Sequence, residues 1–302
     1  MQIRFLDYFV ALAQAKHFAR AAEACHVAQP TLSSGIAALE AQLGKRLIVR
    51  DRRFVGLTTE GHALLPWAQR LLADYDGLRH AVADEGGPLR GTLRLGVIPA
   101  AMPAVGHLVR AILETHPHVT ANIRSMTSRQ IEQALIEYEL DAGLTYLSNE
   151  PPAQVLTVPL YEEHYMFATR ADAPLGQRSS VEWREVAEEP LCLLHPNMQN
   201  RRILDAHLTS LDLSIEPRAT ADSYVTLLSL VEAGGLSSIL PHSYAALVSA
   251  GTRIRLIDFA DPARANMIGL VVLEREPRSA LARAACRVAT TLSGSQLLGP
   301  VR

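Results

Sequence analysis

The chain has 302 residues, of which 48% are hydrophobic and 20% charged. This length predicts two or three domains, and this composition excludes a disordered chain, a collagen and a disulfide-stabilised scaffold. The three cysteines, Cys25, Cys192 and Cys286, are far apart, so we expect no zinc site, no disulfide framework and a reducing compartment. No apolar run is long enough to cross a membrane, and the first segment is typical of a folded helix and not of a signal peptide. We therefore expect a cytoplasmic protein with no membrane partner, no metal and no cofactor.

The net charge of −2 hides an asymmetry along the chain. Residues 1–62 carry eight basic and five acidic residues, a net charge of +3, whereas the other 240 residues carry 21 and 26, a net charge of −5. Five of the basic residues lie between Lys45 and Arg53. Such a patch in a nearly neutral protein favours a polyanionic partner, although a solvated loop face would look the same.

Apolar residues recur at helical spacing in three N-terminal segments, 2–14, 18–25 and 29–43. Pro30 falls in the first turn of the third segment, where its missing N–H has no helical partner, and Gly44 takes the position just past its end. A short helix, a tight turn and a second helix predict a helix-turn-helix. Residues 47–57 alternate apolar and charged residues, which predicts a small β-ribbon, or wing.

A long helix follows the predicted wing and begins at a capping threonine. Pro66 should bend this helix or delay its start. Apolar residues spaced four and three apart form a seam that predicts either a dimer contact or packing on the helix's own domain. The residues that we assign to dimerisation are Leu64, Leu71 and Leu78. The segment 85–88, Glu-Gly-Gly-Pro, is the clearest linker in the chain.

From residue 91 onward, short apolar strands alternate with helices. This alternation predicts parallel α/β layers. About 210 residues exceed what one small sheet needs, so two subdomains are expected.

The outward face of the predicted helix 29–43 consists of small and short side chains. That is unusual for a solvated face and suits the major groove of DNA, which admits one α-helix. The wing arginines can bind phosphates or enter a minor groove. The alternative is a helical hairpin that packs on its own chain. The predicted DNA-binding residues are Gln29, Pro30, Thr31, Ser33, Ser34, Arg50, Arg52 and Arg53.

One pattern runs through residues 1–61: Leu6, Phe9, Phe18, Ala21, Ala22, Gln29 to Ser33, Ile36, Leu39, Glu40, Leu43, Gly44, Leu47, Arg50, Leu57, Thr58 and Gly61. It resembles the winged helix-turn-helix of the LysR-type transcriptional regulators. The chain departs from the usual family pattern at Lys16-His17, where Gly-Ser is common, at Ala28, where Ser is frequent, and at Ile48, where Phe is usual. The first departure could weaken a helix cap and the second removes one possible phosphate contact.

This resemblance implies a fold and a domain plan. The fold is α/β with an N-terminal all-α winged helix-turn-helix and an effector domain of two Rossmann-like subdomains, similar to periplasmic binding proteins. The expected domains are 1–58 for DNA binding, 59–88 for the linker and dimerisation helix, and 91–302 for the effector. The last divides into subdomain I, 91–161 and 266–302, and subdomain II, 162–265.

The effector site is expected between the subdomains, where strands end and helices begin. Helix N-termini and a guanidinium group favour an anion there, so the predicted effector is a small organic acid or anion. The alternative is that the hydroxyl residues are plain helix caps, the arginines are solvated and the methionine is core. The predicted effector-binding residues are Ala100, Ala101, Met102, Thr127, Ser128, Tyr146, Met198, Asn200, Arg201 and Arg202.

We therefore expect a bacterial, DNA-binding transcriptional regulator controlled by a small effector. Its expected partners are promoter DNA with an inverted repeat, the effector, and copies of itself in a homodimer, with a homotetramer implied by the resemblance. A solute-binding or metabolic α/β protein with an accessory helical domain is the alternative. The sequence shows no Walker loop, His-Glu-x-x-His or Gly-x-Ser-x-Gly motif, which argues against an enzyme. Redox sensing is a minor hypothesis, because Cys25 and Cys192 fall at apolar positions.

Overall fold

The computed structural model describes residues 2–50, 54–82, 88–248 and 253–293. The chain divides into two compact units, made mainly of residues 1–87 and 88–302. Each unit has its own hydrophobic core. In the part of the chain described, no helix is long and apolar enough to cross a membrane.

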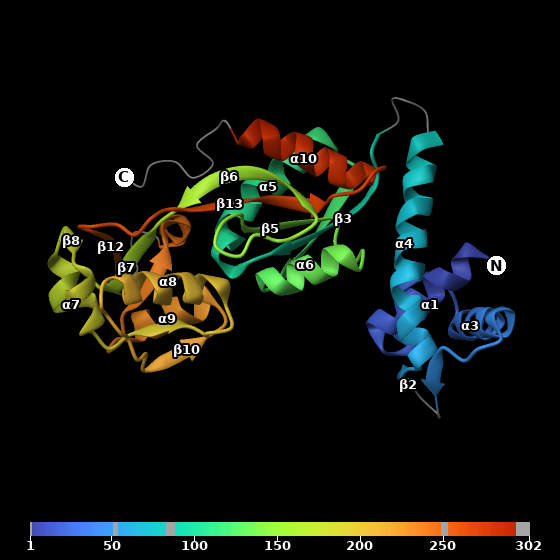
Figure 1. Ribbon diagram of the computed structural model, residues 1–302, viewed down its shortest axis with the longest axis horizontal. Helices are drawn as coiled ribbons and strands as arrows, with labels where there is room; N and C mark the ends of the chain where they lie inside the picture. The colour runs from blue at the N-terminus through green and yellow to red at the C-terminus, as the bar shows by residue number, and fades with distance from the viewer. Residues whose placement is uncertain (1, 51–53, 83–87, 249–252, 294–302) are drawn as a thin grey trace. The chain divides into compact units, whose positions relative to one another are not determined.

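The N-terminal unit is a small helical domain with a two-stranded ribbon (Figure 1). Its elements are α1 (Ile3–Ala15), α2 (Phe18–Ala24), α3 (Gln29–Leu43), β1 (Ile48–Arg50), β2 (Phe54–Leu57) and α4 (Thr59–Val82). The strands β1 and β2 pair antiparallel, which agrees with the predicted wing. Helix α4 begins ahead of Pro66 and continues through it, so the proline does not delay the start of the helix.

Close contacts fix the position of α3 within this domain. A Cβ on Gly35 would lie 2.5 Å from the ring of Tyr8, so α1 and α3 approach too closely for any larger residue. The buried carboxylate of Glu40 accepts hydrogen bonds from the backbone N–H of Leu47, at 2.9 Å, and of Ile48. The wing therefore starts at a position fixed by α3.

The C-terminal unit contains two main sheets. Sheet I has the strand order β4-β3-β5-β13-β6, and sheet II the order β11-β7-β12-β8. The strands of sheet I are β3 (Gly91–Val97), β4 (Val119–Ser125), β5 (Ala142–Tyr146), β6 (Val155–Glu163) and β13 (Asn266–Leu273). Those of sheet II are β7 (Tyr165–Arg170), β8 (Ser180–Val181), β11 (Ser238–Pro241) and β12 (Ile254–Phe259). A parallel pair, β9 (Cys192–Leu194) and β10 (Ala219–Ala221), lies in the same part of the chain as sheet II.

The helices of the unit follow the same division. Sheet I carries α5 (Met102–Thr115), α6 (Ser128–Ile136) and α10 (Ala280–Leu292), with α10 and α6 on opposite faces (Figure 1). The segment with sheet II contains α7 (Trp183–Ala187), α8 (Gln199–Ser210) and α9 (Tyr224–Ala233). The described residues of the unit also form three short 3-10 helices: η1 (Pro99–Ala101), η2 (Pro174–Gln177) and η3 (His242–Leu247). We call the parts built on the two sheets subdomain I and subdomain II.

The strand directions differ from the parallel layers expected from the sequence. The pairs of β3 with β4 and β5 are parallel, but β13 runs antiparallel to β5 and to β6. In sheet II, β7 runs antiparallel to both β11 and β12. Chain connectivity explains the mixture, because β6 and β13 carry the chain between the subdomains in opposite directions.

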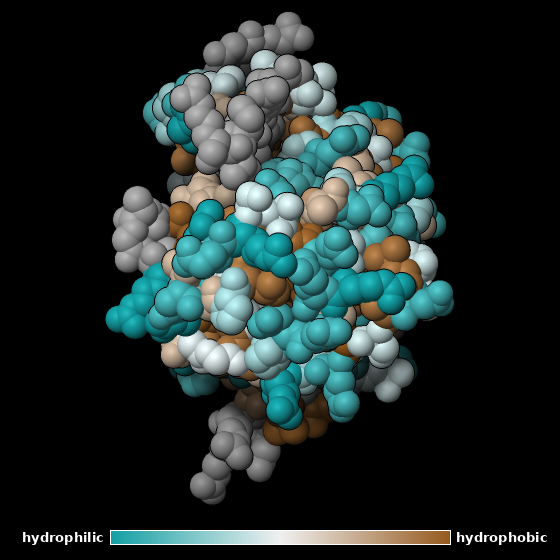
Figure 2. Space-filling model, turned by 90° about the vertical axis from the view of Figure 1, so that its left-hand side faces the viewer, coloured by the Kyte–Doolittle hydropathy of each residue, from teal (hydrophilic) through white to brown (hydrophobic). Residues whose placement is uncertain are grey.

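The surface of subdomain II seen in Figure 2 is mostly hydrophilic, with small separate apolar areas. Such scattered apolar residues are normal for a folded protein and need no partner to explain them.

Candidate functional site

The first candidate site is the start of α3. Four of its five predicted DNA-contacting side chains, Gln29, Pro30, Thr31 and Ser34, are exposed, and Ser33 is half-buried. The N-cap of the helix, Ala28, makes no side-chain cap, so the first-turn N–H groups keep their hydrogen-bonding capacity for a ligand. Helix α3 thus presents short polar side chains and free donors at one end.

The wing is described only in part. Arg52 and Arg53 lie outside the described residues, and Arg50 is the last residue of β1. Lys45 and Arg46, between α3 and β1, are exposed. Both residues add to the basic surface of this unit. We did not assign them to DNA binding from the sequence, although they belong to the basic cluster between Lys45 and Arg53.

The predicted seam on α4 divides into two parts. Leu64 is half-buried and packs on the core of its own domain. Leu71 and Leu78 are 46% and 60% exposed, and Trp67 and Tyr75 beside them are 63% and 40% exposed. The exposed apolar stripe of α4 therefore consists of Trp67, Leu71, Tyr75 and Leu78.

The second candidate site is a pocket in the C-terminal unit, between subdomains I and II. Its empty volume is about 240 Å³, a figure that includes crevices around the lining atoms and a part open to solvent. Little of that volume is enclosed, so only a molecule of very few atoms can occupy the pocket. The lining residues are Ile98, Pro99, Ala100, Thr127, Ser128, Tyr146, Leu194, Met198, Gln199 and Asn200.

Six of the ten predicted effector residues line this pocket: Ala100, Thr127, Ser128, Tyr146, Met198 and Asn200. Ala101, Met102, Arg201 and Arg202 do not. Gln199 was not among the residues predicted to bind the effector. Its polar side chain and its position between two predicted residues, Met198 and Asn200, were signals for including it.

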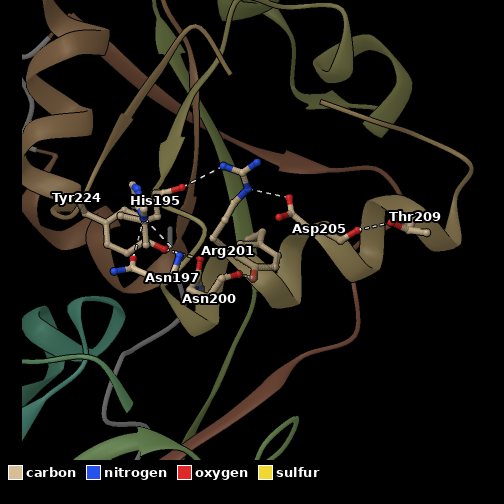
Figure 3. A network of polar contacts seen from close by, with 9 residues as sticks. His195, Asn197, Asn200, Arg201, Asp205, Thr209 and Tyr224 are labelled. Carbon is tan, nitrogen blue, oxygen red and sulfur yellow. Dashed lines mark hydrogen bonds and ion pairs between the residues drawn. The ribbon is translucent and has the colours of Figure 1, made fainter. Parts of the chain in front are cut away.

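The two arginines are engaged elsewhere. The guanidinium group of Arg201 donates to Asp205, at 2.7 Å, and to the carbonyl oxygen of Leu194, at 3.0 Å (Figure 3). Arg202 binds both carboxylate oxygens of Glu150, and this ion pair holds the pKa of Glu150 below its usual value. Neither guanidinium group is thus part of the anion site that we expected.

Two helices begin at the pocket in different ways. At α6, the hydroxyl of Thr127 accepts the N–H of Gln130, and the side chain of Gln130 accepts the N–H of Thr127, so this end is capped reciprocally. At α8, the N-cap Met198 supplies no side-chain cap. The start of α8 therefore offers backbone donors next to the pocket.

Gln199, the first residue of α8, also lines the pocket. Its side chain is 4% exposed, and its Nε2 donates to the carbonyl oxygen of Asn149 at 3.0 Å. That bond fixes the amide orientation, because a flipped amide would turn one oxygen toward another. The buried Oε1 of Gln199 is then left without a partner.

A buried polar network lies behind the pocket lining. Tyr146 donates its hydroxyl to Oε1 of Glu163 at 2.6 Å, and Nδ2 of Asn200 donates to the same oxygen at 3.1 Å. Tyr224 in turn donates to Oδ1 of Asn200 (Figure 3), and Tyr165 donates to the backbone oxygen of Asn200. Tyr146 belongs to subdomain I and Asn200 to subdomain II, so the network joins the two.

None of the three cysteines lines the pocket. Cys192 is buried in β9, where its Sγ lies 3.4 Å from the carbonyl oxygen of Ser237 and burial raises the pKa of its thiol. Burial and the nearby Asp7 raise the pKa of Cys25 to about 11. Both thiols are thus held in the protonated, less reactive form.

Two family models match the chain. They are described as "Bacterial regulatory helix-turn-helix protein, lysR family", over residues 3–62, and "LysR substrate binding domain", over residues 86–292. The chain belongs to the LysR family. It is therefore a LysR-type, DNA-binding transcriptional regulator and not an enzyme, and the resemblance over residues 1–61 is confirmed.

Several relatives are named for a response to peroxide. The chain is 33% identical, over 94% of its length and 91% of the relative, to a "Probable hydrogen peroxide-inducible genes activator" of Mycobacterium leprae. It is similar to a cysteine-to-aspartate variant of full-length OxyR from Pseudomonas aeruginosa, with 27% identity, a TM-score of 0.75, and coverage of 96% of this chain and 94% of that one. A hydrogen peroxide-bound cysteine-to-serine mutant of Corynebacterium glutamicum OxyR has 27% identity and a TM-score of 0.59, and 97% of this chain matches 95% of it.

Proposed function

We propose that this regulator is controlled by a small uncharged molecule that binds in the pocket between subdomains I and II. The observation that carries the proposal is that the pocket lining combines an uncapped helix start with Gln199, whose buried side-chain oxygen has no partner. The start of α8 supplies backbone donors, and the buried Oε1 of Gln199 supplies an acceptor without a partner. A ligand with both a donor and an acceptor satisfies both, since an unpaired buried polar group costs about 1–3 kcal/mol.

An organic acid is the weaker candidate. It was expected because Arg201 or Arg202 could bind a carboxylate, and both are engaged with Asp205 and Glu150. A carboxylate ligand has no hydrogen to donate, so it would leave the oxygen of Gln199 unpaired and face it with negative charge. The sequence-based prediction of an anionic effector therefore loses its main support.

Hydrogen peroxide is the first uncharged candidate. It is small, carries two donors and several acceptor lone pairs, and relatives of this chain are named for their response to it or for binding it. In this chain it would bind without a covalent step, because no cysteine lines the pocket. Thiol oxidation at Cys192 is disfavoured by the raised pKa of that buried thiol.

At the DNA end, we propose that Gln29, Thr31, Ser33 and Ser34 reach base edges or phosphates and that the wing arginines Arg50, Arg52 and Arg53 bind phosphates. Pro30 would shape the first turn of the helix beside them.

The stripe of Trp67, Leu71, Tyr75 and Leu78 on α4 is proposed as the dimer contact, which would present two related heads to an inverted repeat. A tetramer would need a second contact through the C-terminal units. The domain limits expected from the sequence, with a change of subdomain near residues 161 and 265, are part of the same proposal.

The effector proposal is tested by comparing probes that differ in charge, among them the isosteric pair of acetamide and acetate. The full chain is titrated with acetamide, acetate, hydrogen peroxide and chloride while its melting temperature is measured. We expect acetamide or peroxide to raise the melting temperature and acetate and chloride to leave it unchanged. The variant Gln199→Leu, which lacks the buried acceptor, should lose that response. Stabilisation by acetate alone, retained in Gln199→Leu, would overturn the proposal.

A further inference from the structure

One buried carboxyl group lies where the chain passes between the subdomains. Glu163 is the last residue of β6, and only His164 separates it from β7 of sheet II. The residue is fully buried. Within the described residues no cation is paired with it, and its hydrogen-bond partners are the uncharged side chains of Tyr146 and Asn200.

The two oxygens of this carboxyl group have different surroundings. Oε1 accepts one hydrogen bond from each subdomain, from Tyr146 and from Asn200, whereas Oε2 is buried without a partner. Because Oε1 already accepts two hydrogen bonds, the proton of the neutral acid belongs on Oε2. Ionisation would instead leave a buried, negatively charged oxygen without a donor, which is costly.

The surroundings favour the neutral acid. Burial raises the pKa of Glu163 to about 8, against which the hydrogen bonds from Tyr146 and Asn200 act only in part. Within the described part of the chain, five tyrosines from β5, β6, β7, α9 and η3 interact electrostatically with Glu163, and burial keeps each of them protonated. They are Tyr146, Tyr161, Tyr165, Tyr224 and Tyr244.

Both donors to Glu163 also line the pocket. When the carboxyl group is neutral, Tyr146 and Asn200 each give it one ordinary hydrogen bond and hold their places in the pocket wall. When it is ionised, both bonds become charge-assisted, and Oε2 requires a further donor. The donors nearest in the network are the same two side chains, so they would turn toward Glu163 and change the wall that the ligand meets.

We propose that Glu163 is a positioning residue that acts through Tyr146 and Asn200 and keeps the pocket competent for its effector only while the carboxyl group carries its proton. This inference rests on the proposed function, since it assigns a control to the same pocket. It predicts that the regulator responds to its effector in neutral or mildly acidic surroundings and loses the response as the pH rises above about 8.

The first test measures acetamide binding to the full chain by calorimetry from pH 6 to pH 9.5. For the wild type, the dissociation constant should be constant up to about pH 8 and then rise about tenfold per pH unit. Glu163→Gln, which keeps the shape and the acceptor of the neutral acid, should bind as the wild type does at pH 6 and show no such rise. Glu163→Ala should bind weakly at every pH, and Glu162→Gln, at the exposed neighbour on the same strand, should follow the wild type.

The second test needs no ligand. Hydrogen–deuterium exchange is measured over the first turn of α8 at pH 6.5 and pH 9 and corrected for the intrinsic exchange rate. Protection should change with pH in the wild type and in Glu162→Gln but not in Glu163→Gln. Equal changes in all three proteins would overturn the inference about Glu163. A lack of acetamide binding together with the expected exchange pattern would overturn only the proposed class of effector.

Discussion

The helices α3 and α8 both begin without a side-chain cap, yet they lie in opposite surroundings. The first residues of α3 are exposed, and every side chain that we assign to DNA on that helix falls within one stretch of the chain. The first residues of α8 are buried, and Gln199 and Asn200 among them have partners in segments tens of residues away, Asn149 and Glu163. An uncapped helix start is thus available to a large partner in one case and only to a small molecule in the other.

The largest expected effect is at α3. Ser34→Glu would place a negative charge against the phosphates and bases that the helix approaches, so binding to a duplex selected from a random library should fall by more than about 100-fold. The fold should be retained, because exposed polar substitutions usually change stability by no more than about 0.5 kcal/mol. Circular dichroism checks the fold, and Gln42→Glu at the other end of α3 is the control. An unfolded domain would show that Ser34 does not point outward.

A second large effect is expected on α4. Leu71→Asp puts a charge into the exposed apolar stripe, which should convert dimers to monomers in analytical ultracentrifugation and weaken DNA binding with it. Arg70→Ala, one residue away on the same helix, should leave the dimer intact. Dimers that persist in Leu71→Asp would mean that copies associate through another surface.

The free energy of unfolding should depend on pH through the buried carboxyl group of Glu163, for which the exposed start of α3 has no counterpart. Since the pKa of Glu163 is raised to about 8 from an ordinary value of 4.5, the folded protein holds a proton that the unfolded chain releases. The contribution of Glu163 to stability is therefore fully present below pH 4.5 and is lost as the pH rises toward 8. This one group should account for about 3 kcal/mol lost by pH 7. Urea unfolding at several pH values should show this slope in the wild type and a flatter one in Glu163→Gln, whereas identical slopes would contradict it.

A smaller effect is expected from substitution of Arg201, and it tests whether this arginine stabilises the fold or binds the ligand. Its side chain is 8% exposed and bonded to Asp205 and Leu194. Arg201→Ala should lower the free energy of unfolding by about 1–3 kcal/mol, because the buried carbonyl oxygen of Leu194 and the partly exposed carboxylate of Asp205 lose their hydrogen bonds. Acetamide affinity should change less than threefold. Loss of ligand binding at unchanged stability would return Arg201 to the effector site.

The smallest expected effect concerns the thiols. A variant with serine at Cys25, Cys192 and Cys286 should keep its melting-temperature response to hydrogen peroxide within about twofold in midpoint, because no thiol lines the pocket. Complete loss of the peroxide response in a variant that still folds would assign sensing to a cysteine.

The sequence predicted the DNA-binding unit well because its signals are local. Helical spacing, Pro30 and Gly44 define α3 within fifteen residues, and the alternation after it defines the wing.

Six of the lining residues of the pocket were also predicted, since strand ends and helix starts are marked by short motifs. The sequence did not show that the guanidinium groups of Arg201 and Arg202 are already bonded within the protein. Asp205 binds the first and the distant Glu150 binds the second, so both compete with any ligand. No strand was predicted for residues 155–162, because their apolar residues are interrupted by Pro159 and show no clear period. Nothing in the sequence singled out Glu163 as a functional residue.

The single residue between β6 and β7 limits how the two subdomains can move. His164 offers one pair of backbone dihedral angles at this connection, and its ring is stacked at 3.9 Å on His242. A rotation about such a point displaces atoms in proportion to their distance from it. Residues beside the pivot, among them Glu163, would then shift by fractions of an ångström while the outer ends of the sheets travel much farther. A ligand of a few atoms can in this way have an effect on the scale of a whole domain.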